Sequence, residues 1–306
     1  MTNTVTLGDV EITRIPEWSG YFLPGTDFVA GSTPEDWIRH QPALAPDHWA
    51  PETGLTTIAM QLWALRSAGR LILVDTGVGN DKERPVMPVM HRRKSDLLDR
   101  LAAAGIEPQD VDVVVTTHIH ADHVGWNTRL DGADWVPTFP NATYLMPEAD
   151  YEFFRPGSTG PGPAMPELHA NVFEDSVAPV FQAGQGELFG DSYQVDSHLT
   201  LSAVPGHTPG SSVLTLTSGR DRAVFVGDLV HSPMQILEPQ LNSCFCEDPA
   251  VAAASRGRIL GWAADNRALL FPAHLAGHGA AEVQRSEGTF VISGWAGFEV
   301  PERDPQ

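Results

Sequence analysis

Three histidines and an aspartate lie within six residues, in the string His118-Ile119-His120-Ala121-Asp122-His123. The string directly follows residues 111–117, an apolar run that is typical of a buried strand. Imidazole nitrogens and carboxylate oxygens are the ligands that zinc and other borderline first-row metals prefer. Burying so many polar side chains at one strand end is unfavourable without such a partner. The string therefore predicts a metal centre at the carboxyl end of a strand, where α/β folds build their sites.

Three further residues offer what such a centre would still need. His207 lies in the segment Val-Pro-Gly-His-Thr-Pro-Gly, Asp228 ends the apolar run 223–228, and His274 follows the apolar run 269–273. Taken singly, each is ordinary, because a lone histidine after a strand is more often structural and aspartate is common in turns. Together they complete the inventory of two metals about 3.5–4 Å apart with a carboxylate able to bridge them.

The order of these motifs resembles the metallo-β-lactamase superfamily, in its two-metal hydrolase branch. The resemblance runs from Asp75-Thr76-Gly77 to His274. It implies an α/β fold, the αββα sandwich, with two central sheets between outer helices. It also implies a ligand set: His118, His120 and His207 for one metal, Asp122, His123 and His274 for the second, and Asp228 as the bridge. Two divalent metal ions are the implied cofactors. Zinc is the first candidate, and manganese, iron or cobalt would also suit these ligands.

Such a centre predicts hydrolysis by a metal-bridging hydroxide, with one metal polarising the substrate oxygen. Asp122 is both a predicted ligand and a candidate shuttle for the proton that moves toward the leaving group. Asp75 is a candidate partner for a ligand imidazole, which would fix the orientation of that ring. A role for Asp75 in capping the turn that follows is an equally good prediction from the sequence.

The position three residues after Asp228 separates two subfamilies. The resemblance implies a tyrosine there in N-acyl-homoserine lactonases, whereas this chain has His231. The GDxxH element is similar to that of methyl parathion hydrolase and its relatives. We therefore expect a lactone, a carboxylic ester or a phosphotriester as substrate. We name His231 as a second candidate catalytic residue that donates to the leaving group or to the substrate oxygen, with a structural role as the alternative.

Other functions on the same fold remain open at this point. A non-heme di-iron redox protein is one, although flavodiiron proteins have glutamate where His120 stands. A thioesterase of the glyoxalase II type is another, but we find no binding features for its substrate. A non-catalytic binding protein is disfavoured because every ligand position is retained.

Composition narrows the kinds of partner that the chain could bind. The chain has 306 residues, of which 42% are hydrophobic, and its net charge is −20. The negative charge disfavours nucleic acid, whose recognition rests largely on Lys and Arg. The chain has no run of 18 apolar residues, which disfavours a membrane span. Cys244 and Cys246 are too close together for a disulfide framework and are predicted to be free thiols. We expect a small-molecule substrate, a cytoplasmic location because no secretory signal is visible, and a homodimer as an open prediction.

Periodicity and turn residues place the elements around the motifs. We predict a hairpin over residues 5–14 and paired strands over 55–65 and 70–74. Helices are predicted over 95–105, capped by Ser95, over 147–154, 167–183 and 250–264, the last with Val251, Ser255, Ile259 and Trp262 on its buried face. Further strands are predicted at 143–146 and within 193–230. We predict one domain over residues 1–306, with an N-terminal arm around 16–52 and a lid loop around 155–185.

Overall fold

The chain opens with the predicted hairpin, whose turn is formed by Gly8 and Asp9. Strand β1 (Thr4–Leu7) pairs antiparallel with β2 (Val10–Pro24), and Leu7 lies opposite Val10. Val10 and Ile12 are buried between the two large sheets described below. Ile15 is buried in a different core, because successive strand residues point to opposite faces and it lies three positions after Ile12. The computed structural model describes residues 3–160 and 162–304.

The hairpin belongs to the first sheet, in the order β1-β2-β5-β6-β7-β10-β11, with β4 beside β5. The remaining strands are β4 (Trp49–Ala50), β5 (Leu55–Ser67), β6 (Arg70–Val74), β7 (Val113–Val115), β10 (Thr143–Pro147) and β11 (Gly186–Phe189). The strands from β6 to β11 run parallel. The predicted strands at 55–65, 70–74 and 143–146 are confirmed.

The second sheet has the order β12-β13-β14-β15-β17-β18-β19. Its strands are β12 (Ser192–Gln194), β13 (Leu199–Ala203), β14 (Ser212–Ser218), β15 (Asp221–Gly227), β17 (Leu269–Pro272), β18 (Ala281–Ser286) and β19 (Thr289–Trp295). The inner faces of the two sheets meet in one apolar core. Trp63 of the first sheet, for example, packs against Phe271 of the second with ring centroids 4.9 Å apart.

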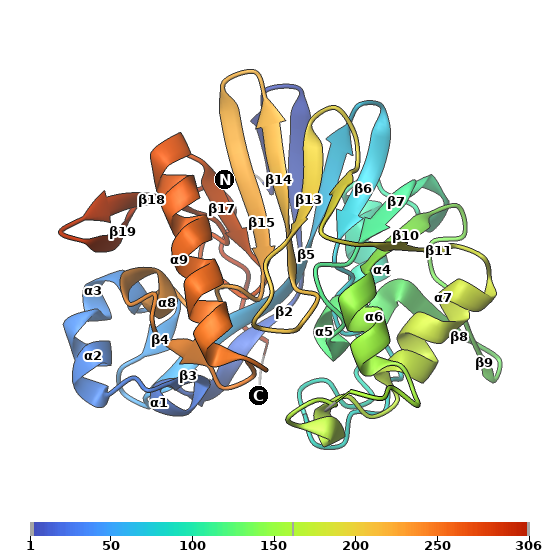
Figure 1. The fold of residues 1–306 in the computed structure, drawn as a ribbon, viewed down its shortest axis with the longest axis horizontal. Helices are drawn as coiled ribbons and strands as arrows, with labels where there is room; N and C mark the ends of the chain where they lie inside the picture. Colours follow the sequence, from blue (N-terminus) through green and yellow to red (C-terminus); the bar gives the residue numbers. More distant parts are fainter. Residues whose placement is uncertain (1–2, 161, 305–306) are drawn as a thin grey trace.

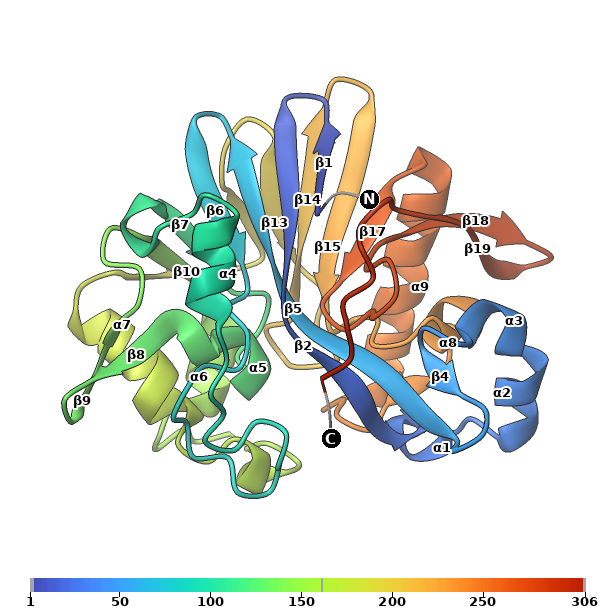
Figure 2. The ribbon, with the colours of Figure 1, turned by 180° about the vertical axis from the view of Figure 1, so that it is seen from behind.

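Helices cover the outer face of each sheet (Figures 1 and 2). Helices α4 (Leu97–Ala103), α6 (Glu148–Phe154) and α7 (Ala178–Gln182) lie beside the first sheet, and α9 (Pro249–Asn266) lies beside the second. Leu97 and Leu101 of α4 join the core on the outer side of the first sheet, and Ile259 and Leu260 of α9 join the core on the outer side of the second. The order helix, sheet, sheet, helix confirms the αββα sandwich.

Short elements complete the chain and surround the ends of the strands. They are α1 (Gly25–Phe28), β3 (Val29–Ala30), α2 (Pro34–Arg39), α3 (Gln41–Leu44), η1 (Pro108–Asp110), α5 (Ala121–Val124), η2 (Gly125–Asn127), β8 (Thr128–Asp131), β9 (Asp134–Pro137), η3 (Pro166–Leu168), the π-helix η4 (Phe173–Val177), α8 (Met234–Leu237) and β16 (Asn242–Ser243). Figure 1 shows α1, α2 and α3 gathered near α8, to the left of the lower part of α9.

Three predicted boundaries were wrong. The N-terminal arm begins later than residue 16, because β2 continues to Pro24 in register with β5. Ser95 does not cap α4: Asp96 holds that position, and the Ser95 hydroxyl donates to Glu17 instead. The helix expected over 167–183 is broken into η3, η4 and α7, with Asn171 at a φ of 66° between the first two.

The helix expected over 250–264 is confirmed as α9, and its predicted buried face is confirmed in part, because Ser255 and Ile259 are buried and Trp262 is half-buried. Val251 is 39% exposed, whereas Ala252, Ser255, Arg256 and Ile259 are buried. The buried stripe is therefore turned by about one residue from the predicted one.

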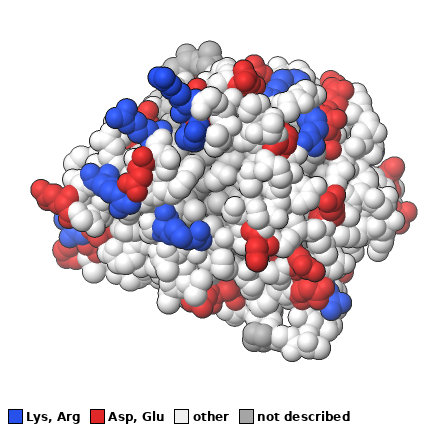
Figure 3. All heavy atoms as spheres, turned by 45° about the horizontal axis from the view of Figure 1, so that its top comes forward, with Lys and Arg blue, Asp and Glu red and all other residues white. Residues whose placement is uncertain are grey.

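The prediction of one domain over residues 1–306 stays a prediction, as does the lid over 155–185. Residues 1–2, 161 and 305–306 fall within those ranges but outside the described residues. Among the helices of the described part, none is long and apolar enough to cross a membrane. On the face drawn in Figure 3, basic side chains are interspersed with acidic ones.

Candidate metal centre

The seven predicted ligands come together at one edge of the sandwich, each shortly after a strand. His118 follows β7, His207 follows β13, Asp228 follows β15 and His274 follows β17. Strands β15 and β17 are parallel neighbours, so their carboxyl ends lie at the same edge. The string after β7 approaches from the first sheet, so the site lies where the ends of the two sheets meet.

The first group of ligand atoms contains His118, His120, His207 and Asp228, all of them buried. His120 Nδ1 lies 3.1 Å from His118 Nε2 and 3.0 Å from His207 Nε2. Asp228 Oδ2 lies 3.6 Å from His118 Nε2 and 3.3 Å from His207 Nε2. Tetrahedral zinc with bonds of about 2.0–2.1 Å places neighbouring ligand nitrogens roughly 3.3–3.4 Å apart, close to these spacings.

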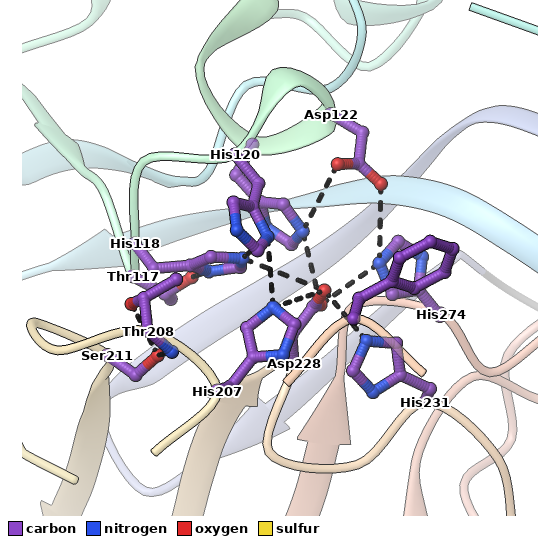
Figure 4. A network of polar contacts seen from close by, with 12 residues as sticks. Thr117, His118, His120, Asp122, His207, Thr208, Ser211, Asp228, His231 and His274 are labelled. Carbon is purple, nitrogen blue, oxygen red and sulfur yellow. Dashed lines mark hydrogen bonds and ion pairs between the residues drawn. The ribbon is translucent and has the colours of Figure 1, made fainter. Parts of the chain in front are cut away.

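The second group contains Asp122, His123 and His274. Asp228 Oδ1 faces this group, at 3.1 Å from His123 Nε2 and 3.0 Å from His274 Nε2. Asp122 lies 3.4 Å from His274 Nε2 and 3.8 Å from His123 Nε2. One oxygen of Asp228 thus faces each group, which is the geometry a bridging carboxylate requires. Figure 4 shows the contacts converging on Asp228.

Unsatisfied buried atoms support a fit to metal ions. His123 Nε2 and Asp228 Oδ1 lie 3.1 Å apart, yet neither makes a hydrogen bond with any residue that the structure describes. Leaving buried polar atoms without partners costs about 1–3 kcal/mol each. A cation between these atoms would satisfy both of them. The donor set and its spacing therefore fit two divalent ions.

Electrostatics in the protein alone also prepare the site for cations. Burial holds the pKa of His118 and His120 well below the ordinary value, so both rings are neutral as ligands must be. Burial would also lower the pKa of His123, but Asp228 and Asp75 hold it well above the ordinary value. Burial opposes ionisation of Asp228, yet the surrounding histidines hold its pKa well below the ordinary value. Metal binding would release the proton that His123 holds.

Neighbouring groups orient three of the ligand rings. His123 Nδ1 lies 2.9 Å from Asp75 Oδ2, and that carboxylate also accepts hydrogen bonds from the amide and hydroxyl of Thr117. The Thr117 hydroxyl lies 3.0 Å from His118 Nδ1. His274 Nδ1 lies 2.9 Å from the carbonyl of Ala59. Asp75 therefore contacts the imidazole of a predicted ligand, which is the first of the two roles the sequence left open.

Sequence reasoning missed Asp150, which connects two ligand loops. Its buried carboxylate accepts hydrogen bonds from the amide of Ile119 at 2.9 Å, the hydroxyl of Thr208 at 2.9 Å and the amide of Gly210 at 2.5 Å. Burial raises its pKa to about 6, against the opposing effect of these hydrogen bonds. Asp150 is about 30 residues from Ile119 and about 60 from Gly210 in sequence, and no local pattern marks it.

A largely apolar pocket opens onto both groups and encloses about 680 Å³, part of it open to solvent. Its apolar lining residues are Phe22, Phe28, Ile58, Met60, Val86, Met87, Met90, Ala121, Met165, Leu168 and Phe245. Asp122, Asp228 and His274 lie at its polar end. His169, also missed from the sequence, lines the pocket and lies 4.9 Å from the His120 ring.

His231 lies at the same polar end of the pocket. Its Nε2 atom is 3.0 Å from Asp228 Oδ2, and its ring stacks on that of His274 with centroids 5.5 Å apart. The edge of the ring meets Phe28 at a centroid distance of 5.6 Å. Both ring nitrogens are buried and make no hydrogen bond within the described part of the chain. The predicted candidate catalytic residue is therefore placed beside the ligands and facing the pocket.

Comparison with known proteins gives consistent matches. Residues 61–294 match the family model described as the metallo-beta-lactamase superfamily. The N-acyl homoserine lactonase AttM of Rhizobium radiobacter is 31% identical over 118 residues, which cover 38% of this chain and 40% of that protein. Metallo-beta-lactamase domain-containing protein 1 of Homo sapiens is 31% identical over 200 residues, which cover 64% of this chain and 57% of that protein. The match thus spans about two fifths of the first of these relatives.

Two solved structures share the fold over almost their whole length. One is AidC, described as a dizinc quorum-quenching lactonase, with a TM-score of 0.77, 21% identity and coverage of 99% of this chain and 98% of that one. The other is the hydrolase AbOPH, with a TM-score of 0.79, 21% identity and coverage of 100% and 99%. These likenesses confirm the predicted fold.

Proposed function

The chain belongs to the metallo-β-lactamase superfamily, and on that premise we propose that it is a dinuclear metal-dependent hydrolase of a lactone, carboxylic ester or phosphotriester. The observation that carries the proposal is the pair of ligand groups beside a largely apolar pocket, with one oxygen of Asp228 facing each group. We propose zinc as the metal, held by His118, His120, Asp122, His123, His207, Asp228 and His274.

When bound, two divalent ions would lower the pKa of a water molecule between them and polarise the oxygen of the substrate. The chain supplies the groups that move the proton. The Asp122 side chain is 12% exposed, more than the other predicted ligands, and it lines the pocket. Asp122 can therefore accept a proton on one oxygen and pass it to the leaving group.

We propose that His231 donates a hydrogen bond to the substrate oxygen. Burial lowers its pKa to about 4, so near pH 7 the ring is neutral and keeps one N–H to donate. We expect His231→Ala to retain two metals and to lose kcat/KM by about 10²–10³-fold, as for the loss of one oxyanion donor. Metal analysis and steady-state kinetics of the variant measure both quantities. Near-normal kcat/KM with metals retained would leave His231 a structural residue.

The pocket indicates the kind of substrate. Eleven apolar side chains surround the space beside the predicted ligands, and three of the four methionines among them lie on loops. Methionine adapts its shape to different apolar groups. An acyl chain beside the scissile bond would fill this space, so N-acyl homoserine lactones, the substrates named for several relatives, are the first class to test. Phosphotriesters are the second class to test, because the GDxxH element that ends in His231 is similar to that of methyl parathion hydrolase.

The test combines elemental analysis with a hydrolysis panel of acyl-homoserine lactones, simple lactones, p-nitrophenyl esters and paraoxon-type triesters. We expect about two zinc ions per chain and turnover that a chelator abolishes and added metal restores. Two iron ions without hydrolysis would favour the redox alternative. No metal after metal-replete expression would overturn the ligand assignment.

The cytoplasmic location and the homodimer belong to the same proposal. Sedimentation of the purified protein tests the homodimer, for which two chains per particle are expected. A particle of one chain at micromolar concentration would contradict it.

A further inference from the structure

Each predicted ligand histidine turns one ring nitrogen toward the candidate centre. The outer nitrogen of His120, Nε2, makes no hydrogen bond with the described residues, whereas the outer nitrogens of the other four have partners. Oxygen atoms partner the outer nitrogens of His118, His123 and His274, as described above. His207 differs from these three. Its Nε2 atom joins the first group, and its Nδ1 atom faces the sulfur of Cys246 at 3.7 Å.

The backbone fixes the position of this thiol. The amide of Glu247 donates to the carbonyl of His207 at 2.9 Å, and the amide of Asp248 donates to the carbonyl of Gly206 at 2.8 Å. The segment that carries Cys246 is thus hydrogen-bonded directly to the segment that carries His207. Placement of the sulfur beside His207 therefore does not depend on the weak contact between the two side chains.

The start of α9 holds both segments in place. Asp248 caps the helix by accepting a hydrogen bond from the amide of Val251 at 3.0 Å. Gly206 has a φ of 133°, and a Cβ atom there would lie 2.2 Å from the amide nitrogen of Ala252. The loop carrying His207 is therefore packed against the helix that the Cys246 segment begins.

We propose that Cys246 is a positioning residue for His207. The Nδ1–H group donates to Sγ, which keeps the proton on Nδ1, holds the ring in place and leaves the Nε2 lone pair directed at the first group. This inference rests on the proposed ligand set and assigns a function to a thiol outside that set. In comparable sites the loss of such a supporting partner weakens metal binding by about 10–100-fold.

The effect should be confined to one of the two ions. His207 belongs to the first group of ligand atoms, whereas Asp122, His123 and His274 form the second without it. Removal of the thiol should therefore weaken one binding step and spare the other. A residue that only packs the region would change the stability of the metal-free protein instead.

Cys244 provides a matched control two residues away. Both thiols are free and half-buried. Cys244 packs against the core on the outer side of the first sheet, and its amide donates to the carbonyl of Phe28 at 3.0 Å. Within the described residues, its sulfur makes no hydrogen bond with a ligand histidine.

The experiment titrates the metal-free protein with Zn²⁺ in competition with a chromophoric chelator, for the wild type and for Cys246→Ala, Cys246→Ser and Cys244→Ala. Thermal melts of each metal-free form are recorded in parallel. We expect Cys246→Ala to weaken one of two binding steps by about 10–100-fold, with an unchanged metal-free melting temperature. Cys246→Ser should stay near the wild type because its hydroxyl oxygen can accept the same hydrogen bond, and Cys244→Ala should match the wild type in both steps.

Two outcomes would overturn the inference. One is two wild-type binding steps that Cys246→Ala leaves unchanged. The other is a loss of metal-free stability in Cys246→Ala that weakens both steps equally, since that indicates packing alone. Failure of the wild type to bind two ions is a different result, because it overturns the proposed function itself.

Discussion

Asp228 lies between the two groups of candidate ligands and contacts both of them. Its Oδ2 atom faces His118 and His207, and its Oδ1 atom faces His123 and His274. A buried carboxylate is costly unless opposite charge or hydrogen bonds compensate it. In the protein alone, protonated imidazole supplies that charge. The same arrangement explains why metal binding should release protons, and why residues that orient single rings matter for affinity.

Asp75 is the clearest of these orienting residues, and Asp75→Asn tests it. We expect the variant to fold and to bind the second metal about 10–100-fold more weakly, because an amide NH₂ group would then face His123 Nδ1. Competition titration with a chelator measures the change. Asp265→Asn, at an exposed ion pair with Arg285, is the control and should bind both metals normally. Equal affinities in the two variants would contradict the prediction.

Lys82 is buried and makes stability depend on pH. Its ammonium group donates to Thr128 and to the carbonyl of Asp175, and it lies 3.6 Å from the centre of the Trp135 ring. Burial lowers its pKa to about 7, although Asp175 opposes the shift. Between that value and the ordinary value near 10.5, the unfolded chain binds more protons than the folded one. Stability should therefore rise with pH across this window.

The measurement is urea unfolding at several pH values between 7 and 10, for the wild type and for Lys82→Met. We expect the free energy of unfolding of the wild type to rise relative to that of the variant as pH increases. Lys94, which is exposed and pairs with Asp81, gives the control Lys94→Met. A constant difference between wild type and Lys82→Met would show that the lysine keeps its ordinary pKa.

Sequence could predict which candidate ligands the structure brings together, but not the residues that contact them. His118 to His123 form one string, and the other ligands follow strands, so short patterns reveal them. Asp150 and Cys246 bear on the ligands only through contacts between segments about 30–60 residues apart, formed after folding. No local spacing marks such pairs. His169 was not predicted for the same reason, since it contacts His120, which is distant in sequence.

At the level of elements, a buried arginine holds the loop that follows Asp228 in place by hydrogen bonds to its backbone. Arg256 lies on the buried face of α9 and donates to the carbonyls of Leu229, Pro239 and Leu241 at 2.7–2.8 Å. Burial lowers its pKa to about 10. The loop thus held includes His231. Arg14 acts in the same way on the loop after His274, donating to the carbonyls of residues 275–277.

Replacement of Arg256 tests the importance of this fastening. We expect Arg256→Met to reduce the free energy of unfolding by about 2–4 kcal/mol, since each buried carbonyl left without a donor costs about 1–3 kcal/mol. Arg258 lies on the exposed face of the same helix, and Arg258→Met should change stability by less than about 0.5 kcal/mol. Chemical denaturation measures both. Similar values for the two variants would mean that the loop is held by other contacts.

Elements with strong local signals were predicted, and those decided by packing were not. The hairpin at Gly8-Asp9 and strands β5 and β6 follow from alternation and turn residues. The extension of β2 to Pro24 depends on pairing with β5, which the sequence of β2 alone does not encode. In α9, Arg256 occupies the buried stripe that Val251 was expected to share, because carbonyls across the helix accept its hydrogen bonds.

For the whole molecule, metal should contribute directly to stability. An ion that binds only the folded state adds about 4 kcal/mol when its concentration is 1,000 times Kd. We expect stripping with a chelator to lower the melting temperature by several degrees and Zn²⁺ to restore it. Ca²⁺, which prefers oxygen ligands, should have no such effect. Calorimetry of the stripped and refilled protein measures the change, and a melting temperature indifferent to Zn²⁺ would contradict the prediction.

Each group of candidate ligands combines residues that follow strands of both sheets, so an ion in either group would link distant parts of the chain. His120 precedes His207 by 87 residues, and a shared ion would close that stretch of chain into a loop. A disulfide stabilises a fold by restricting the unfolded chain, whereas an ion that binds only the folded state stabilises it through its binding free energy. In this chain, whose two cysteines are both free, the ions would link distant segments of the folded state without a covalent bond between them. Unlike a disulfide, this cross-link would open and close with the supply of free metal.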